Sequence, residues 1–297
     1  MGSVNRNTQK QFECIMIKKF SMALGLLFLV VIGTCFSIYS KATRLPENRP
    51  QAVLNQTVDT DKMVVVCLGD SLTHGRVSHN YVDELDERFP DDYLFVNAGI
   101  NSELAYIVLQ RIETVIALKP DYITVLIGTN DALGTLGEQS AQRYIEKWNL
   151  PQAPDRKWFR QNLVRIVTRL KQETRAQIAL LSLPPITENP DHPGYIQARN
   201  YSRDIRLIAQ EQQLAYLPLH EVLTFAVEGE ARENKLVFRG PERTLMYKAL
   251  AARFLLGRNW DAISAKNGFI FLTDFIHLNK KGADIVADLI DDFVRHN

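Results

Sequence analysis

The chain has 297 residues, of which 46% are hydrophobic and 23% are charged, a composition ordinary for a globular protein with one large domain or two small ones. The formal net charge of +1 hides an asymmetry, because residues 1–42 hold five Lys or Arg against one acid, leaving 30 basic against 33 acidic residues in the rest. The larger part is therefore mildly acidic and has no basic stripe, which excludes nucleic acid as an expected partner.

The first predicted element is a membrane segment. Residues 20–40 contain no charged side chain, and Lys18 and Lys19 directly precede them. The length suits a bilayer, and the basic flank favours a cytoplasmic amino terminus. We predict a cytoplasmic tail over 1–19, a transmembrane signal anchor over 20–40 and a linker over 41–61, with the domain that follows outside the cytoplasm, periplasmic or extracellular. Ser40-Lys41-Ala42 resembles a cleavage site, so a cleaved signal peptide and a secreted domain stay open.

Beyond residue 62, strand-like apolar runs alternate with helix-like segments five times. The predicted strands cover 63–68, 93–96, 122–127, 178–183 and 215–219, and the predicted helices cover 77–89, 102–118, 158–174, 196–212 and 280–294. This alternation is typical of a parallel sheet with helices on both sides. We assign 62–297 to this domain and interpret 221–271, which breaks the alternation, as an insertion near the mouth of the site, helical around 242–256.

Cysteine usage predicts no cross-link. The three cysteines, Cys14, Cys35 and Cys67, fall in the tail, in the apolar run and in the first strand. One thiol in the exported domain has no intramolecular partner, and no Cys/His pair has zinc spacing.

Ser71 follows the first predicted strand directly, in Gly69-Asp70-Ser71. That strand is apolar throughout, as expected of a strand buried on both faces. In open α/β sheets, ligands bind at the carboxyl ends of the strands, so a hydroxyl placed there is positioned to meet a substrate. A polar turn without function has a similar local sequence, so the assignment depends on the rest of the chain.

Three further segments supply groups that complete a catalytic site. The third strand ends before Asn130, whose amide can donate to an oxyanion at the same sheet edge, although such a residue alone is more often a turn or helix cap. The second strand leads into 97–102, where backbone N–H groups before a helix are free to bind an anion. Asp274 and His277 lie three residues apart before the last helix, so the acid can orient the imidazole that activates the serine.

In this order along the chain, the motifs resemble those of the SGNH, or GDSL, hydrolase family. The matching blocks are Gly69-Asp70-Ser71-Leu72, Gly128-Thr129-Asn130-Asp131 and Asp274-Phe275-Ile276-His277. The resemblance implies a three-layer α/β/α sandwich with a five-stranded parallel sheet, flavodoxin-like in type, and hydrolysis of an ester or thioester through an acyl-serine.

The resemblance also implies roles for individual residues. Ser71 is the implied nucleophile, His277 the general base and then acid, Asp274 its partner, and Asn130 joins the Ser71 backbone N–H in the oxyanion hole. The implied supporting residues are Gly69, Asp70, Gly128 and Asp131. No metal or organic cofactor is needed, because side chains and water complete this chemistry.

One departure from the family pattern concerns the oxyanion hole. The second family block commonly ends in a glycine whose N–H joins the hole, and here that position is Ser102. A serine keeps the backbone donor, but its side chain narrows the site and restricts the backbone.

Alternatives remain for the base and for the function. His220, beside Glu221, is a rival base without an acid three residues upstream. The leading hypothesis is a carboxylic ester hydrolase, of the esterase, lipase or lysophospholipase type, acting on a small-molecule, lipid or glycan ester. The alternative is a membrane-anchored binding protein with the same fold and little or no turnover.

Overall fold

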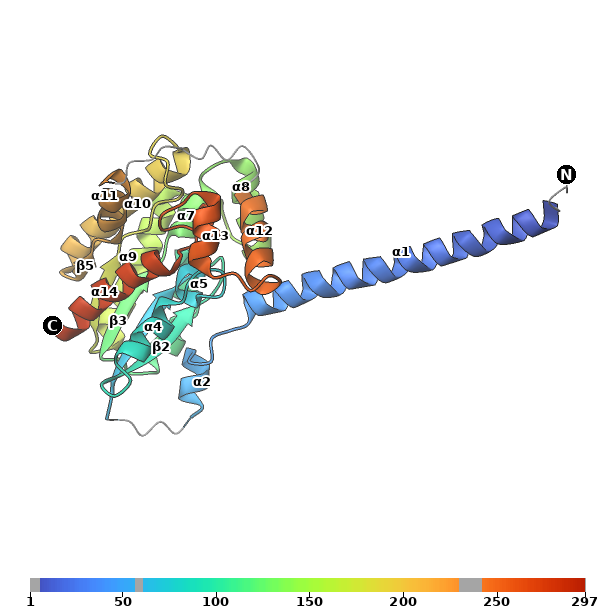
Figure 1. Cartoon of the computed structure of the whole chain (residues 1–297). Helices are drawn as coiled ribbons and strands as arrows, with labels where there is room; N and C mark the ends of the chain where they lie inside the picture. Colours follow the sequence, from blue (N-terminus) through green and yellow to red (C-terminus); the bar gives the residue numbers. More distant parts are fainter. Residues whose placement is uncertain (1–5, 57–60, 230–241, 297) are drawn as a thin grey trace. The chain divides into compact units, whose positions relative to one another are not determined.

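The computed structural model describes residues 6–56, 61–229 and 242–296. The chain divides into two units, 1–43 and 44–297. The first contains the helix α1 (Arg6–Thr43), drawn in blue in Figure 1. Among the described residues, α1 provides the one helix segment long and apolar enough to cross a membrane, Lys19–Thr43. The apolar run predicted over 20–40 lies inside this segment.

The second unit is built on a sheet of five parallel strands. They are β1 (Met63–Gly69), β2 (Tyr93–Gly99), β3 (Tyr122–Leu126), β4 (Gln177–Leu181) and β5 (Ala215–Leu217). Their order is β2-β1-β3-β4-β5, which is the flavodoxin-like order and confirms the predicted sheet. Gly69 pairs with Gly99 on one side and Leu126 on the other, so the first three strands end at a common edge.

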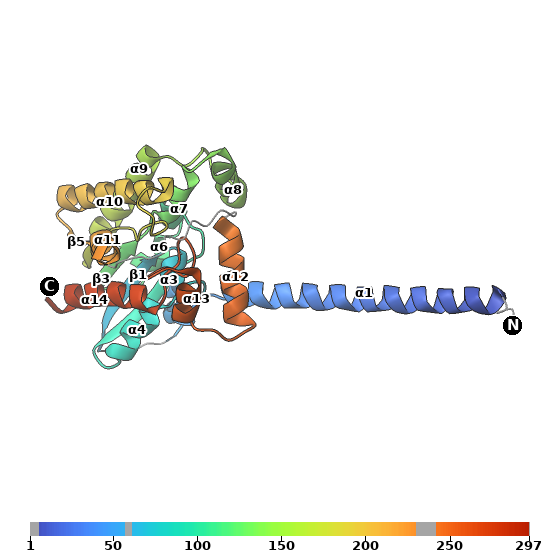
Figure 2. The ribbon, with the colours of Figure 1, turned by 45° about the horizontal axis from the view of Figure 1, so that its top comes forward.

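Helices cover both faces of the sheet, and Figure 2 shows the strands between the two helical layers. One layer holds α4 (Tyr81–Arg88), α11 (Leu219–Gly229), α13 (Trp260–Asn267) and α14 (Lys280–His296). The other holds α5 (Ala105–Gln110), α7 (Thr129–Gly134), α9 (Arg156–Glu173) and α10 (Pro193–Gln212). The remaining helices are α2 (Pro50–Leu54), α3 (Ser71–His74), α6 (Glu113–Ile116), α8 (Glu138–Trp148) and α12 (Glu242–Phe254).

The structure differs from the predicted elements in several places, among them α8, which no predicted helix covers. The helix predicted over 102–118 is two short helices, α5 and α6, because the backbone leaves helical geometry at Arg111. The Arg111 guanidinium is turned back to the carbonyls of Gly69 and Ala98 and to Glu103. The region 221–271 contains the rest of α11, then α12 and α13, while 230–241 lies outside the described residues.

The packing of β1 fixes where its last residues point. Val65 through Leu68 are fully buried, since helices cover both faces of the strand. At Gly69, a Cβ would lie 2.2 Å from Thr73 Oγ1 and 2.5 Å from the Leu126 carbonyl oxygen. Only glycine lets the chain fold back this tightly between β3 and α3, so the serine two residues later begins a helix at the sheet edge.

Candidate active site

Ser71 is the first residue of the one-turn helix α3. Asp70 caps this helix, because its Oδ1 accepts the Leu72 N–H at 3.0 Å, and Gly75 ends it with a left-handed φ of 73°. The short helix therefore has a defined start and a defined end. Ser71 is 7% exposed, so its hydroxyl lies at the surface of a largely buried site.

The structure brings Ser71, His277 and Asp274 together. Ser71 Oγ lies 3.1 Å from His277 Nε2, and His277 Nδ1 lies 2.8 Å from Asp274 Oδ2. The other carboxylate oxygen of Asp274 accepts the backbone N–H groups of Ile276 at 2.7 Å and His277 at 2.8 Å. Asp274 is thus held by its own loop while it faces the imidazole.

Burial and charge act against each other in this pair. Burial by itself disfavours the Asp274 carboxylate, but the His277 charge and three hydrogen bonds outweigh it, so the pKa of Asp274 lies below its ordinary value. Burial likewise disfavours the imidazolium, but the Asp274 charge and hydrogen bond outweigh it and raise the pKa of His277. The pair therefore favours a carboxylate beside an imidazole that accepts a proton readily.

The loop that carries Asp274 and His277 is held on one side by Glu188. The Glu188 carboxylate is buried and accepts three consecutive backbone N–H groups, from Ile270 at 3.0 Å, Phe271 at 2.7 Å and Leu272 at 3.1 Å. The neighbouring Thr187 N–H donates to the Phe275 carbonyl at 2.7 Å. The segment after β4 thus fixes the chain on the approach to the histidine.

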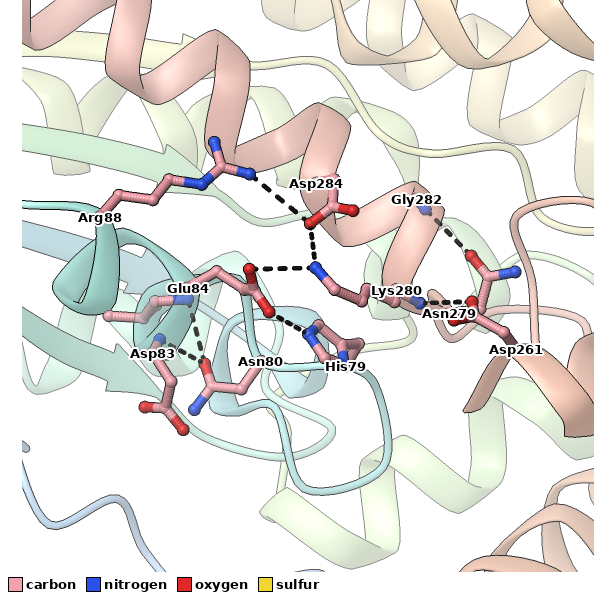
Figure 3. A network of polar contacts seen from close by, with 11 residues as sticks. His79, Asn80, Asp83, Glu84, Arg88, Asp261, Asn279, Lys280, Gly282 and Asp284 are labelled. Carbon is pink, nitrogen blue, oxygen red and sulfur yellow. Dashed lines mark hydrogen bonds and ion pairs between the residues drawn. The ribbon is translucent and has the colours of Figure 1, made fainter. Parts of the chain in front are cut away.

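On the other side, the loop is held by the segment that follows α3. Ser78 Oγ accepts the Leu278 N–H at 2.9 Å and donates to the Leu278 carbonyl at 3.1 Å. The polar network beside this contact is drawn in Figure 3, where Glu84 bridges His79 at 2.9 Å and Lys280 at 3.1 Å. Leu278, the residue directly after His277, is therefore tied to the segment between α3 and α4.

Asn130 lies beside the serine, but its amide already has partners. Asn130 Nδ2 donates to Asp70 Oδ2 at 3.1 Å and to the Glu103 carbonyl at 3.0 Å, while Oδ1 accepts the Tyr144 hydroxyl at 2.8 Å. The two acceptors around Nδ2 fix which way the amide faces. A direct bond from Asn130 to an oxyanion requires one amide N–H to leave its present acceptor or to be shared with it.

The backbone donors predicted for the oxyanion hole are free. Within the described part of the chain, the N–H groups of Ser71 and Ser102 donate to no other residue. Ser102 has a left-handed φ of 67°, in the region that glycine enters without strain. The serine thus adopts a glycine-like backbone, at a cost of about 1 kcal/mol.

The predicted supporting residues are buried around this centre. Burial raises the pKa of both Asp70 and Asp131 to about 7. Asp131 Oδ2 accepts the Ala105 N–H at 3.0 Å and so anchors the start of α5. Gly128 has a φ of 126°, and a Cβ there would lie 2.7 Å from the Phe159 ring, so this turn needs glycine.

The structure separates two other histidines from these roles. His220, the predicted rival base, has Nδ1 3.0 Å from the Leu183 carbonyl oxygen, and burial lowers its pKa. His74 is 1% exposed and lies against the end of β2. Its backbone lies so close to Gly99 that a Cβ there would be 2.2 Å from the His74 nitrogen.

Four residues that hold parts of the site in place were not singled out from the sequence: Glu188, Ser78, Tyr144 and Trp148. Tyr144 and Trp148 stand four residues apart in a helical segment, a spacing that puts both on one face. That spacing was the one available signal. Glu188 and Ser78 act on partners more than 80 residues away, and no local pattern indicates such contacts.

The sheet order, together with a site at the carboxyl ends of its strands, defines a doubly wound α/β protein. The model of the GDSL-like Lipase/Acylhydrolase family matches residues 67–285, and the chain belongs to this family. Membership supports carboxylic ester hydrolysis as the reaction class. The search of curated proteins found no match.

Solved structures with the same fold include three named hydrolases. An acetyl xylan esterase is 18% identical, with a TM-score of 0.54 over 78% of this chain and 100% of the other. An acetylxylan esterase from Geobacillus stearothermophilus is 16% identical, with a TM-score of 0.54 over 79% and 94%. A lipase/acylhydrolase from Enterococcus faecalis is 17% identical, with a TM-score of 0.52 over 79% and 96%. At these identities the likeness concerns the fold.

The His277–Asp274 pair generates a titration prediction. We expect the imidazole of His277 to titrate above the ordinary value of about 6.5, and the Asp274→Asn variant to lower that pKa, because the substitution removes the charge that favours the imidazolium. NMR of histidine-labelled protein measures both, with a His277→Ala sample assigning the signal. A pKa that is the same in both proteins would contradict the electrostatic coupling.

Proposed function

We propose that this chain is a membrane-tethered serine esterase that cleaves acyl or acetyl esters through an acyl-serine intermediate. Ser71 is the nucleophile, His277 the general base and then the general acid, and Asp274 the group that orients His277. The observation that carries the proposal is the hydrogen-bonded series from Ser71 Oγ to His277 Nε2 at 3.1 Å and from His277 Nδ1 to Asp274 at 2.8 Å. Membership in the family supports the reaction class.

In the acylation step, His277 Nε2 accepts the Ser71 proton while Oγ attacks the ester carbonyl carbon. The resulting tetrahedral intermediate carries a negative oxygen. When it collapses, the bond to the alcohol oxygen breaks, and the imidazolium returns its proton to the leaving alcohol. Asp274 keeps Nδ1 protonated, so Nε2 is the nitrogen that faces the serine.

The oxyanion is bound in this proposal by the free N–H groups of Ser71 and Ser102. Asn130 provides a third donor once one of its amide protons turns from Asp70 or from the Glu103 carbonyl toward the substrate. Each such donor is worth a factor of about 10² or more in kcat when it is aimed at the developing charge. The geometry of the hole therefore decides the rate as much as the nucleophile does.

In the deacylation step, His277 removes a proton from a water molecule while the water oxygen attacks the acyl carbon. The bond from the acyl carbon to Ser71 Oγ then breaks, the imidazolium returns its proton to Oγ, and the acid product leaves. Both steps require neutral His277. The rate of hydrolysis is therefore expected to rise with pH through the pKa of His277, which is raised in this site. In Asp274→Asn this pKa falls, so the rise in rate is expected to shift to lower pH.

Two substrate classes remain, and each has one supporting observation. An acetyl group on a glycan is supported by the fold shared with proteins named as acetylxylan esterases. An acyl lipid, hydrolysed by a lipase or lysophospholipase activity, is supported by the apolar helix α1, which would hold the domain close to a bilayer. Chain-length preference separates the two, because a short pocket excludes a long acyl chain.

The test is hydrolysis of p-nitrophenyl esters from acetate to palmitate by the full chain in detergent and by its Ser71→Ala variant. We expect the variant to lose at least about 10³-fold in kcat/KM. A peak at acetate favours the glycan ester, and a peak at long chains favours the lipid. Equal activity in the two proteins would refute Ser71 as the nucleophile.

A binding protein with little turnover is the competing function. It predicts no Ser71-dependent hydrolysis of any ester and no reaction of folded protein with a fluorophosphonate. The hydrogen-bonded Ser71, His277 and Asp274 argue against it, because a binding role alone has no use for a serine beside a raised-pKa imidazole.

We further propose that α1 anchors the chain with the esterase domain outside the cytoplasm, periplasmic or extracellular. The support is the apolar segment Lys19–Thr43 with basic residues at its start. Protease added to intact cells, or to cells stripped of any outer membrane, is expected to digest the domain. Protection until the inner membrane is lysed would contradict this orientation, whereas a shortened chain in the medium would indicate cleavage near Ala42 and secretion.

A further inference from the structure

Helix α8 contacts two parts of the proposed oxyanion hole. Tyr144 and Trp148 lie four residues apart on this helix and so share one face. The Tyr144 hydroxyl donates to Asn130 Oδ1 at 2.8 Å, and Trp148 Nε1 donates to the Ser102 carbonyl at 2.8 Å. One face of one helix therefore reaches both the side-chain donor and a backbone donor.

The Tyr144 bond helps to fix the direction of the Asn130 amide from the side of its oxygen. Asn130 is 6% exposed, so without the hydroxyl its Oδ1 would lose its partner in a largely dry site. With the bond in place, Nδ2 is directed toward Asp70, the residue directly before Ser71. The hydroxyl thus acts together with Asp70 and the Glu103 carbonyl, and all three favour the same end of the amide facing the nucleophile.

The Trp148 bond acts on the backbone of Ser102. A serine at a φ of 67° is strained, and an anchored carbonyl keeps it there. Because φ is restricted for a residue with a Cβ, fixing the carbonyl also fixes the direction of the Ser102 N–H. This bond compensates for the serine at the position where the family has glycine.

Helix α8 itself has a limited hold on the domain. None of its residues is fully buried. Tyr144 and Trp148 pack on a small cluster formed by Leu104, Ile107, Leu150 and Trp158, and Tyr144 also packs against the main core. Leu104 comes two residues after Ser102, so the cluster joins α8 to the segment that carries the backbone donor.

We propose that Tyr144 and Trp148 are positioning residues for the oxyanion hole, and that the docking of α8 through these two side chains sets the hole's geometry. The inference rests on the proposed function. It predicts that removing either donor lowers kcat, since the transition state contacts the hole, and leaves KM nearly unchanged.

The experiment compares Tyr144→Phe and Trp148→Phe with two matched controls in the full chain. The controls are Tyr106→Phe, beside the cluster on which α8 packs, and Trp260→Phe, in α13 and outside that cluster. The side-chain polar atoms of Tyr106 and Trp260 make no hydrogen bond within the described residues. Hydrolysis of a p-nitrophenyl ester gives kcat and KM, and thermal unfolding gives the stability of each variant.

We expect kcat to fall about tenfold in Tyr144→Phe and in Trp148→Phe, with KM within about twofold. The controls are expected to keep kcat even where they unfold at a lower temperature. A second readout uses the Asn130→Ala variant. Because Tyr144 acts through the Asn130 amide, its hydroxyl has no amide to position in that variant. Tyr144→Phe is therefore expected to cost no further activity in that background.

Two outcomes would overturn the inference. One is an unchanged kcat in both variants, and the other is a loss of kcat no larger than in the matched controls. These outcomes differ from failure of the proposed function, which would appear as hydrolysis that survives in Ser71→Ala. An enzyme that needs Ser71 but tolerates Tyr144→Phe and Trp148→Phe leaves the proposed function intact and removes the role of α8.

Discussion

The contact between Ser71 and His277 joins two loops that are 206 residues apart in the chain, and the rest of the domain is arranged so that this contact forms. The serine is delivered by a buried strand that ends at a glycine packed too closely for any other residue. The histidine is delivered by a loop that is fixed by the buried carboxylate of Glu188 and by the hydroxyl of Ser78. The hydrogen bond between Ser71 and His277 forms only if both side chains are held in position at the same time.

Buried carboxylates surround this contact, and each is stabilised differently. Asp274 is ionised beside His277 and has a lowered pKa, while burial dominates at Asp70 and Asp131 and raises theirs to about 7. A buried charge is tolerated only with hydrogen bonds or a counter-charge. The two carboxylate oxygens of Asp70 accept hydrogen bonds from the Leu72 N–H and from the Asn130 amide. Asp70 therefore helps to hold Ser71 in position.

Much of the fold could be predicted from the sequence, because it follows from local patterns. Apolar runs of strand length that alternate with helical segments allow few arrangements, and a parallel sheet with covered faces is the one observed. The placement of Ser71 and Asn130 followed from the same rule, since the ends of parallel strands meet at one edge. Asp274 and His277 were indicated by a spacing of three residues within one loop.

What the sequence did not indicate depends on contacts between distant segments. Residues from other loops and helices determine the φ of Ser102 and the partners of the Asn130 amide. They also determine which backbone N–H groups the Glu188 carboxylate accepts. At the break between α5 and α6, Arg111 reaches back to the end of β1, although the helical pattern of 102–118 is continuous. His74 is buried against the end of β2, although its neighbours are polar.

The central claim is that ester hydrolysis proceeds through an acyl group on Ser71. Its most direct test is mass spectrometry of the full chain quenched in acid during turnover of p-nitrophenyl acetate, followed by digestion and peptide mapping. We expect the peptide containing Ser71 to gain the mass of one acetyl group, and the Asn130→Ala protein to accumulate the same adduct more slowly. Turnover with the acetyl group on another residue, or with no adduct during a pre-steady-state burst of p-nitrophenol, would contradict it.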